Sequence, residues 1–335
     1  MTTKDELRWG VIGTANIGRV AVNPAIQASS NGVLLAIASR DEGKARKFAE
    51  ASGVPRHFGS YEALLADADI DAVYVPLPNS LHKEWTIKAA EAGKHILCEK
   101  PLAPSAAECR EMAKADEVNS VTLMEAFMYR FHPRTQRVLE MVQGGRLGEL
   151  RMIRSTFTFR LQRPDDIRLN PELGGGALMD VGCYCVNVSR TLAAAEPVAV
   201  QAAGHWGAHG VEEQLAGTLF FAGGLIAQFD CALTMERCEG YEVAGTEGYL
   251  RVPSAFLPGT DDVVIHEHRG RAGETSHSVN GADEYRLMVE HFADCALNAR
   301  SPRYTAAEAA RNMRVIEGLY QSARNGGERV DLTPG

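Results

Sequence analysis

Apolar and polar positions follow two different rhythms along the chain. Up to about residue 125, short runs of consecutive apolar residues alternate with segments of helical periodicity. The apolar runs cover residues 9–12, 33–38, 72–76, 95–98 and 121–124, and the helical segments cover residues 42–52, 61–67, 81–92 and 105–116. Strands that are apolar at consecutive positions are covered on both faces. The alternation therefore predicts a doubly wound parallel sheet in an α/β domain.

Beyond about residue 150 the pattern changes to strands joined by short, glycine-rich turns. These strands cover residues 150–159, 198–205, 216–221, 225–233, 241–244, 249–252 and 262–266, and one helix, residues 177–193, follows the triple glycine 174–176. Strands joined by tight turns predict a second, α+β domain with a large open, mostly antiparallel sheet. Two more helices are expected at residues 283–298 and 306–325. We expect domains at residues 1–127 and 128–305, with residues 306–335 packing back on the first domain.

Length and composition narrow the class of protein. The chain has 335 residues, of which 45% are hydrophobic and 23% charged, and 43 acidic against 35 basic residues give a formal net charge of -8. These values are typical of a globular protein with a buried core, and they do not favour binding to nucleic acid or to a membrane. The polar start, residues 1–8, lacks the apolar segment of a signal peptide. The seven cysteines have no paired spacing typical of disulfides or of a zinc site, so we expect reduced thiols, a cytoplasmic location and no metal.

A glycine turn follows the first predicted strand. Residues 13–18 read Gly-Thr-Ala-Asn-Ile-Gly, one substitution from the dinucleotide fingerprint of Rossmann domains. Gly13 permits the tight turn, and Gly18 lets the helix approach the sheet closely. Free N–H groups at the helix start attract a pyrophosphate. We therefore expect Gly13, Thr14, Ala15, Asn16 and Ile17 to bind the cofactor.

The end of the second strand indicates which cofactor is bound. An NAD site places a carboxylate there to hold the ribose hydroxyls. This chain has Ser39 and Arg40, with Lys44 one helical turn later. A hydroxyl and two cations suit the 2′-phosphate of NADP. Asp41 is the nearby acid that would repel this phosphate if it pointed inward.

Two further segments carry candidate chemistry. Glu99-Lys100-Pro101 follows a strand directly, and ligands of such sheets bind at the carboxyl ends of strands. Asp180 and Tyr184 are four residues apart and share one helical face. A tyrosine can take a hydroxyl proton if a cation such as Lys100 lowers its pKa. The spacing alone fits equally well a half-buried core tyrosine and a surface acid.

These residues together resemble the glucose–fructose oxidoreductase / inositol dehydrogenase (Gfo/Idh/MocA) family. The matching segments are residues 13–18, 75–82, 99–101, 125–133 and 174–184. The arrangement Asp180-x-Gly182-x-Tyr184 is similar to the branch with dihydrodiol dehydrogenase and NADP-dependent D-xylose dehydrogenase. The inositol dehydrogenase branch has histidine in place of Tyr184.

The resemblance implies roles for individual residues. Lys100 would contact the nicotinamide ribose and the substrate, Tyr184 would exchange the proton, and Asp180 would orient the substrate hydroxyl. The implied cofactor-binding set also includes Pro76, Leu77, Asn79, His82, Glu99 and Arg168, the last from a loop over the nicotinamide. The family's open sheet pairs with another subunit, which implies a homodimer or homotetramer.

Three functions are compatible with these residues. The leading expectation is an NADP-dependent aldose dehydrogenase that produces a lactone. The same residues could run in reverse as an NADPH-dependent keto-sugar reductase, with Tyr184 as proton donor. The third is a sugar-sensing regulator on the same fold, which is disfavoured because Lys100 and Tyr184 are both present.

Overall fold

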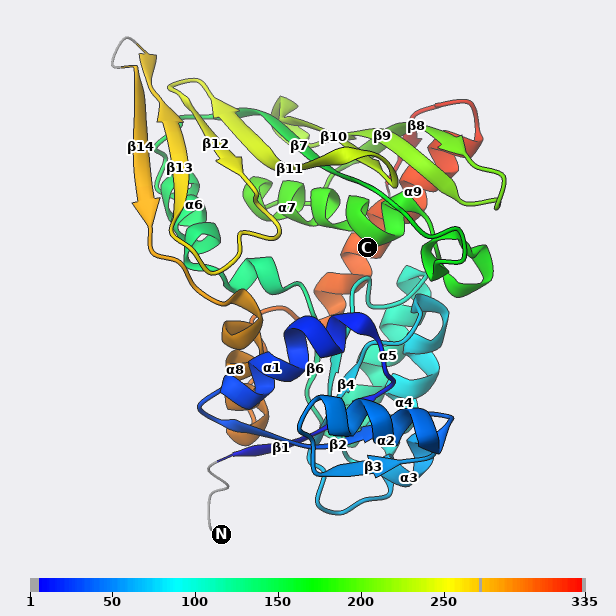
Figure 1. Ribbon diagram of the computed structural model, residues 1–335. Helices are drawn as coiled ribbons and strands as arrows, with labels where there is room; N and C mark the ends of the chain where they lie inside the picture. The colour runs from blue at the N-terminus through cyan, green and yellow to red at the C-terminus, as the bar shows by residue number, and fades with distance from the viewer. Residues whose placement is uncertain (1–5, 271–272, 333–335) are drawn as a thin grey trace. The chain divides into compact units, whose positions relative to one another are not determined.

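The computed structural model describes residues 6–270 and 273–332. The chain divides into two compact units. Unit one comprises Met1–Met128 and Asp283–Ala310, and unit two comprises Tyr129–Ala282 and Arg311–Gly335. Each unit is built around its own sheet (Figure 1).

Unit one contains the predicted parallel sheet. Its six strands lie in the order β3-β2-β1-β4-β5-β6, and each pair is parallel. The strand order reverses between β1 and β4, so the first β–α loop lies at a topological switch point, where such folds bind ligands. The strands are β1 Leu7–Ile12, β2 Gly32–Ala38, β3 Arg56–Phe58, β4 Ala72–Val75, β5 His95–Cys98 and β6 Leu123–Glu125.

Several helices of unit one begin at a residue whose side chain caps them. Asp41, Ser60 and Ser105 each accept a backbone N–H of the helix that they precede. Pro24 is the second residue of α1 and directly follows a π turn, η1 Gly18–Val22, inside a helical stretch that begins at Asn16, so its missing N–H falls where the regular hydrogen-bond ladder is already interrupted. The helices are α1 Asn23–Ala28, α2 Glu42–Ala51, α3 Tyr61–Leu65, α4 His82–Glu91, α5 Ala106–Asn119 and α8 Glu284–Leu297, with a 3-10 turn η2 Asn79–Leu81.

Unit two contains a nine-stranded sheet in the order β14-β13-β12-β11-β7-β10-β9-β8-β15. The pair β7–β10 is parallel and the other seven pairs are antiparallel, which confirms the prediction of a mostly antiparallel sheet. The strands are β7 Leu150–Arg160, β8 Ala199–Trp206, β9 Glu212–Phe220, β10 Ile226–Ala232, β11 Thr234–Gly245, β12 Tyr249–Pro253, β13 Val263–His268, β14 Glu274–Val279 and β15 Val330–Asp331.

One face of this sheet is covered by helix α7, Cys183–Ala193, which packs on β7 and β10 (Figure 1). On β9 and β10 buried and accessible residues alternate, as expected when one face packs on the core and the other does not. Unit two also contains α6 Pro133–Gln143 and most of α9 Ala306–Arg324.

The end of the chain differs from the expected arrangement. We expected residues 306–335 to pack on the first domain, but residues from Arg311 onward belong to unit two. The Ser322 hydroxyl accepts the N–H of Ala202, and β15 pairs with β8. Helix α8 belongs instead to unit one, where the rings of Phe292 and Trp9 lie 5.0 Å apart. Helices α8 and α9 each have an apolar face, and the local sequence does not say which of the two sheets that face covers.

Candidate active site

The glycine turn after β1 has the geometry of an anion cradle. Gly13 has φ +119°, a conformation that side chains rarely adopt, and a Cβ atom there would lie 3.1 Å from Leu77 Cδ2. Its N–H donates to the Ala38 carbonyl, and helical structure begins at Asn16. The first N–H groups of a helix have no acceptor within it. Thr14, Ala15, Asn16 and Ile17 are all accessible, so these residues fit a pyrophosphate.

The end of β2 leaves its cations available to a ligand. Arg40 and Lys44 are exposed, and the Ser39 hydroxyl accepts the Asp41 N–H at 3.3 Å. The Asp41 carboxylate accepts the Lys44 N–H at 2.8 Å and so caps α2. The acid that could have repelled a 2′-phosphate is therefore engaged at the helix start, where a negative charge is favourable.

Tyr61 is a candidate that the sequence analysis missed. A Cβ atom at Gly13 would lie 3.9 Å from the Tyr61 hydroxyl, so this phenol reaches the phosphate turn. Burial raises the pKa of Tyr61, and the positive charge of Arg40 opposes that rise. The sequence signal that could have found Tyr61 was Ser60, a typical helix-capping residue, which places Tyr61 at the first position of the helix that follows β3.

The loops after β4 and β5 are tied together by His82. Its Nδ1 lies 3.0 Å from the Pro101 carbonyl oxygen, and its Nε2 lies 2.7 Å from that of Leu77. His82 is 0% exposed, so it supports these loops from within and does not line their surface. Burial lowers the pKa of His82. Pro76 is buried, while Asn79 remains partly accessible.

Lys100 follows β5 and is partly accessible. The peptide bond between Lys100 and Pro101 is cis. Glu99, the residue before it, accepts the Tyr74 hydroxyl at 2.6 Å and the Lys100 N–H at 3.2 Å. Burial raises the pKa of Tyr74 well above its ordinary value, so this phenol is a hydrogen-bond donor to Glu99. The Glu99 carboxylate thus holds the backbone of the turn that presents the lysine.

In unit two the structure brings Asp180 and Arg168 together. Arg168 Nε donates to Asp180 Oδ2 at 2.6 Å, and Arg168 Nη1 donates to Asp166 Oδ1 at 3.1 Å. The charge of Asp180, followed by that of Asp166, raises the pKa of Arg168 further above its ordinary value. Asp180 lies in a π turn, η6 Leu178–Gly182, that leads into α7. Such turns occur frequently at functional sites.

Tyr184 lies in an aromatic cluster. Its ring centroid is 5.8 Å from that of Tyr129 and 5.4 Å from those of Phe157 and Phe256. The Tyr129 hydroxyl donates to Asn187 Oδ1 at 2.6 Å, and Asn187 lies on α7 about one turn after Tyr184. Tyr184 is therefore held by packing on several sides, with 5% of its surface exposed.

Lys100 belongs to unit one, whereas Asp180, Tyr184 and Arg168 belong to unit two. Contact between the lysine and the tyrosine across a nicotinamide ring therefore stays a prediction. Within unit one the candidate residues lie in the glycine turn, around the end of β2 and in the loops after β4 and β5, and within unit two Arg168, from the 3-10 turn Ile167–Leu169, contacts Asp180 at the start of the helical segment that carries Tyr184.

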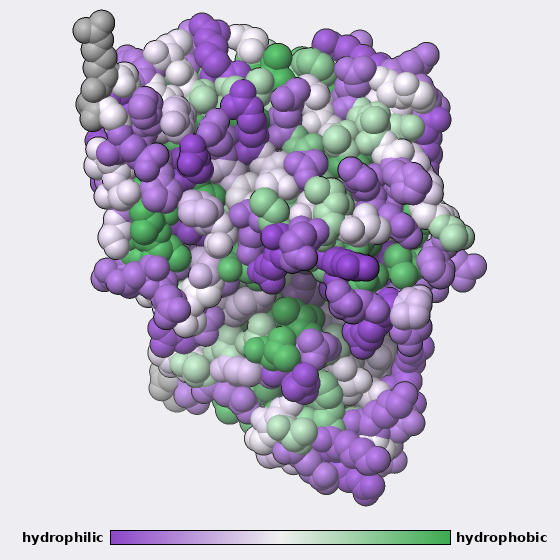
Figure 2. Space-filling model, turned by 45° about the horizontal axis from the view of Figure 1, so that its top comes forward, coloured by the Kyte–Doolittle hydropathy of each residue, from purple (hydrophilic) through white to green (hydrophobic). Residues whose placement is uncertain are grey.

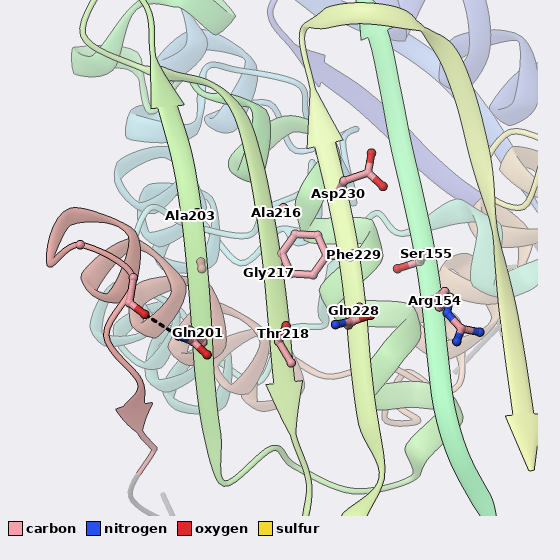
Figure 3. A pocket seen from close by; sticks show the side chains of 13 residues that line it. Arg154, Ser155, Gln201, Ala203, Ala216, Gly217, Thr218, Gln228, Phe229 and Asp230 are labelled. Carbon is pink, nitrogen blue, oxygen red and sulfur yellow. Dashed lines mark hydrogen bonds between the residues drawn. The ribbon is translucent and has the colours of Figure 1, made fainter.

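A separate hollow of about 630 Å³ lies on the sheet of unit two. Figure 3 shows its wall formed by side chains from β7, β8, β9 and β10, including Arg154, Gln201, Thr218, Gln228 and Asp230. None of its lining residues is a candidate named from the sequence.

Several global properties bear on the class of protein. Over residues 6–270 and 273–332, no group of three His, Cys, Asp or Glu residues could hold a metal ion. Within the same ranges, no helix is both long and apolar enough to cross a membrane. All seven cysteines are free thiols, and Cys238 is the exposed one. On the face shown in Figure 2, hydrophilic residues surround the apolar ones.

A Rossmann sheet with an anion-binding glycine turn, followed in the chain by a large mixed sheet, defines a two-unit nucleotide-dependent oxidoreductase. Residues 7–127 match the family described as "Oxidoreductase family, NAD-binding Rossmann fold", and residues 135–251 match "GFO/IDH/MocA C-terminal domain". The chain belongs to the Gfo/Idh/MocA oxidoreductase family, which confirms the resemblance found in its motifs.

Individual relatives cover nearly the whole chain. It is 40% identical over 323 residues to D-xylose 1-dehydrogenase (NADP(+)) 2 of Haloferax volcanii, covering 96% of this chain and 98% of that protein. It is 31% identical to trans-1,2-dihydrobenzene-1,2-diol dehydrogenase of Xenopus laevis, covering 90% of this chain and 93% of the relative. A 3-ketoreductase of Actinomadura kijaniata, solved with NADP and TDP-benzene, is 30% identical with a TM-score of 0.89, covering 95% and 98% of the two chains.

Proposed function

We propose that this chain is an NADP-dependent oxidoreductase that oxidises the C1 hydroxyl of an aldose of the D-xylose type to a lactone. The observation that carries the proposal is the joint placement of Asp180 and Tyr184 at the start of one helix, with Arg168 fixed on Asp180. Its 40% identity to a D-xylose 1-dehydrogenase over 96% of the chain supports the substrate class.

Proton transfer is assigned to Tyr184. The phenolate of Tyr184 takes the proton of the C1 hydroxyl as the C1 hydrogen leaves with its electron pair. Bound NADP supplies the acceptor for that hydride. A neighbouring ammonium lowers the pKa of a phenol by stabilising its charged form, and Lys100 is proposed for this role.

Asp180 is proposed to orient the sugar hydroxyl towards Tyr184. Its Oδ2 is held by Arg168, so the carboxylate has a defined direction and is not free to rotate. Arg168 is proposed to lie over the nicotinamide while it keeps this contact. The Arg168–Asp180 ion pair would then contact both the cofactor and the sugar. The arginine has a fixed position for this role because Asp166 and Asp180 both bind its guanidinium.

Preference for NADP is assigned to the end of β2. Ser39, Arg40 and Lys44 supply a hydroxyl and two cations, and Asp41 is engaged by the N–H of Lys44. The D-xylose 1-dehydrogenase relative is named for NADP(+), and the ketoreductase was solved with NADP. Both observations support NADP over NAD.

The second candidate is reduction of a keto-sugar with NADPH. The ketoreductase from A. kijaniata favours it, because that structure aligns with a TM-score of 0.89. The same residues would serve, with Tyr184 donating its proton to the new hydroxyl. The third reading, a sugar-sensing regulator, is disfavoured because Lys100 and Tyr184 are both retained.

One screen separates these candidates. Free aldoses are incubated with NADP or NAD, and keto-sugars with NADPH, while absorbance of the reduced nicotinamide is followed. We expect turnover with D-xylose or a related aldose and NADP. Turnover of keto-sugars alone would replace the proposal with the reductase, and tight sugar binding without turnover in either direction would favour the regulator.

We also propose that the chain forms a homodimer or homotetramer through the sheet of unit two. Gln201, Ala203, Ala216 and Gln228 are exposed on its strands around the hollow (Figure 3). An open sheet face of this kind is commonly covered by a symmetry-related copy.

A further inference from the structure

Glu212 begins β9, and its carboxylate lies at the N-terminal end of the helix that carries Asp180 and Tyr184. The backbone N–H of Leu178 donates to Glu212 Oε1 at 2.8 Å, and Glu212 is 2% exposed. Ala177, which precedes the π turn η6, has no side-chain cap hydrogen bond. The first N–H groups of a helix need an acceptor from elsewhere. Glu212 supplies it from 34 residues away in the chain.

A second donor orients this carboxylate. The hydroxyl of Tyr320, on α9, donates to the same Oε1 at 2.8 Å, and Glu212 and Tyr320 are 108 residues apart. The guanidinium of Arg324 lies 5.2 Å from the Tyr320 ring centre. Burial raises the pKa of Glu212, while the Leu178 N–H and the Tyr320 hydroxyl oppose the rise. The last helix of the chain thus determines how Glu212 meets the helix start.

The triple glycine is shaped around the same group. A Cβ atom at Gly176 would collide with both carboxylate oxygens of Glu212, and Gly176 has φ +119°. The Gly176 N–H donates to the Arg168 carbonyl at 2.9 Å, and the Asp180 N–H donates to the Gly176 carbonyl at 3.0 Å. One backbone turn therefore connects Glu212 to both members of the Arg168–Asp180 ion pair.

We infer that Glu212, oriented by Tyr320, is a positioning residue that sets where Asp180 and Tyr184 stand. The inference rests on the proposed acid–base role of Tyr184. An uncapped π turn frays, and a shift of about 1 Å at reacting groups can cost about a hundredfold in rate. Glu212 acts through the helix and does not itself touch the sugar or the cofactor.

The test compares four variants of the full chain. Glu212→Ala removes the cap, Glu212→Gln keeps an oxygen acceptor without the charge, and Tyr320→Phe removes only the orienting hydroxyl. Glu213→Ala is the matched control, because Glu213 is the neighbouring glutamate and is only partly buried. For each variant, kcat per folded enzyme, KM for NADP, NADP affinity by calorimetry, the melting temperature and the isotope effect with a C1-deuterated aldose are measured.

We expect Glu212→Ala to lower kcat by about 10- to 100-fold while NADP affinity stays within about twofold. The deuterium isotope effect should rise, because hydride transfer then limits turnover more fully. Tyr320→Phe should lower kcat by a smaller factor of about 3 to 10, because one hydrogen bond to Glu212 is lost while the bond from the Leu178 N–H remains. Glu212→Gln should recover most of the loss, and Glu213→Ala should behave as the parent enzyme.

A folded Glu212→Ala enzyme with the parent's kcat and isotope effect would overturn the inference, as would a lower melting temperature with unchanged kinetics. If Glu212→Ala does not fold, an unchanged kcat in Tyr320→Phe overturns it. The proposed acid–base role of Tyr184 fails by a different result, full turnover in Tyr184→Phe, and the proposed substrate class fails if the parent enzyme turns over no aldose, so these failures are distinguishable from failure of the inference.

Discussion

Arg168 and Asp180 form an ion pair that residue types alone did not connect. The sequence suggested one role for each, Arg168 over the nicotinamide and Asp180 beside the substrate. In the structure the two side chains meet at 2.6 Å, and Asp166 holds the other side of the guanidinium. A charge-assisted contact of this kind gives the carboxylate a fixed orientation. Changes at Arg168 should therefore affect use of the sugar as well as binding of the cofactor.

Removal of the proposed acid–base groups gives the most direct test at this scale. Lys100→Met and Tyr184→Phe should each abolish turnover. In Tyr184→Phe the substrate proton has no acceptor, and in Lys100→Met the Tyr184 phenol keeps its ordinary pKa because the neighbouring ammonium is gone. NADP affinity should stay within about tenfold, since the phosphate contacts are made elsewhere. Steady-state kinetics and calorimetric titration with NADP measure both quantities. Retained turnover in Tyr184→Phe would remove that residue from proton transfer.

Cofactor preference is tested at the end of β2. Arg40→Ala should shift the preference from NADP towards NAD by about 1–3 kcal/mol, the size of a lost charge-assisted hydrogen bond. The ratio of kcat/KM for the two cofactors gives the value. Arg46→Ala, on the same helix α2, serves as a control that should leave the ratio unchanged. Equal preference in the parent and Arg40→Ala would defeat the assignment of the 2′-phosphate site.

At the scale of elements, both helices that follow a glycine-rich loop begin with a π turn. These are η1 Gly18–Val22 before α1, and η6 Leu178–Gly182 before α7. The sequence predicted a helix after each of these loops but not the wider turns, because an apolar pattern does not distinguish one extra residue in a single turn. The three-residue strand β3 was also missed, since so short a segment has no readable alternation.

Helix α6 provides a pH-dependent prediction. Nδ1 of His132 accepts the Arg134 N–H at 3.0 Å and caps the helix, which requires an unprotonated Nδ1. Burial, followed by the charge of Arg134, lowers the pKa of His132 to about 4. The unfolded chain binds this proton near its ordinary pKa of about 6.5. The His132 contribution to stability is therefore complete above about pH 6.5 and is lost as pH falls towards 4.

His132→Asn should remove this slope, because asparagine also caps helices but does not titrate. Urea unfolding of both proteins between pH 4 and pH 7 measures the effect. The difference in unfolding free energy between parent and variant should change by up to about 3 kcal/mol over this window. Parallel stability curves for the two proteins would contradict the assignment.

At the scale of the molecule, the large sheet has a buried face under α7 and an accessible face around the hollow. The exposed large apolar side chains among residues 6–270 and 273–332 are scattered, and they are Val20, Val118, Ile167, Val198 and Met235. Polar and small side chains dominate the hollow itself. An assembly through this face would thus be held by sheet packing with polar contacts as well as by apolar area.

Light scattering after gel filtration tests the assembly. The parent should elute as a dimer or tetramer of the 36.3 kDa chain. Ala203→Arg places a charge on the exposed side of β8 and should shift the mass towards the monomer, because an unpaired charge in an interface is costly. Ala92→Arg, at an exposed position after α4, is the matched control. A monomeric parent would refute the proposed assembly.

Local patterns in the sequence determined much of this protein. The apolar runs predicted the parallel sheet, the glycine turn predicted the dinucleotide site, and Ser39-Arg40 predicted the cofactor. These predictions depend on neighbouring residues, whose spacing and type are sufficient to define a strand or a tight turn and to predict an anion site.

Only the tertiary structure decided how distant segments meet. Tyr320 reaches Glu212 from 108 residues away, Arg168 closes on Asp180, and α8 and α9 divide between the two units. Each of these depends on which apolar faces pack together and which buried polar groups then find a partner. Local sequence leaves both open, because an amphipathic helix has the same pattern whichever sheet it covers.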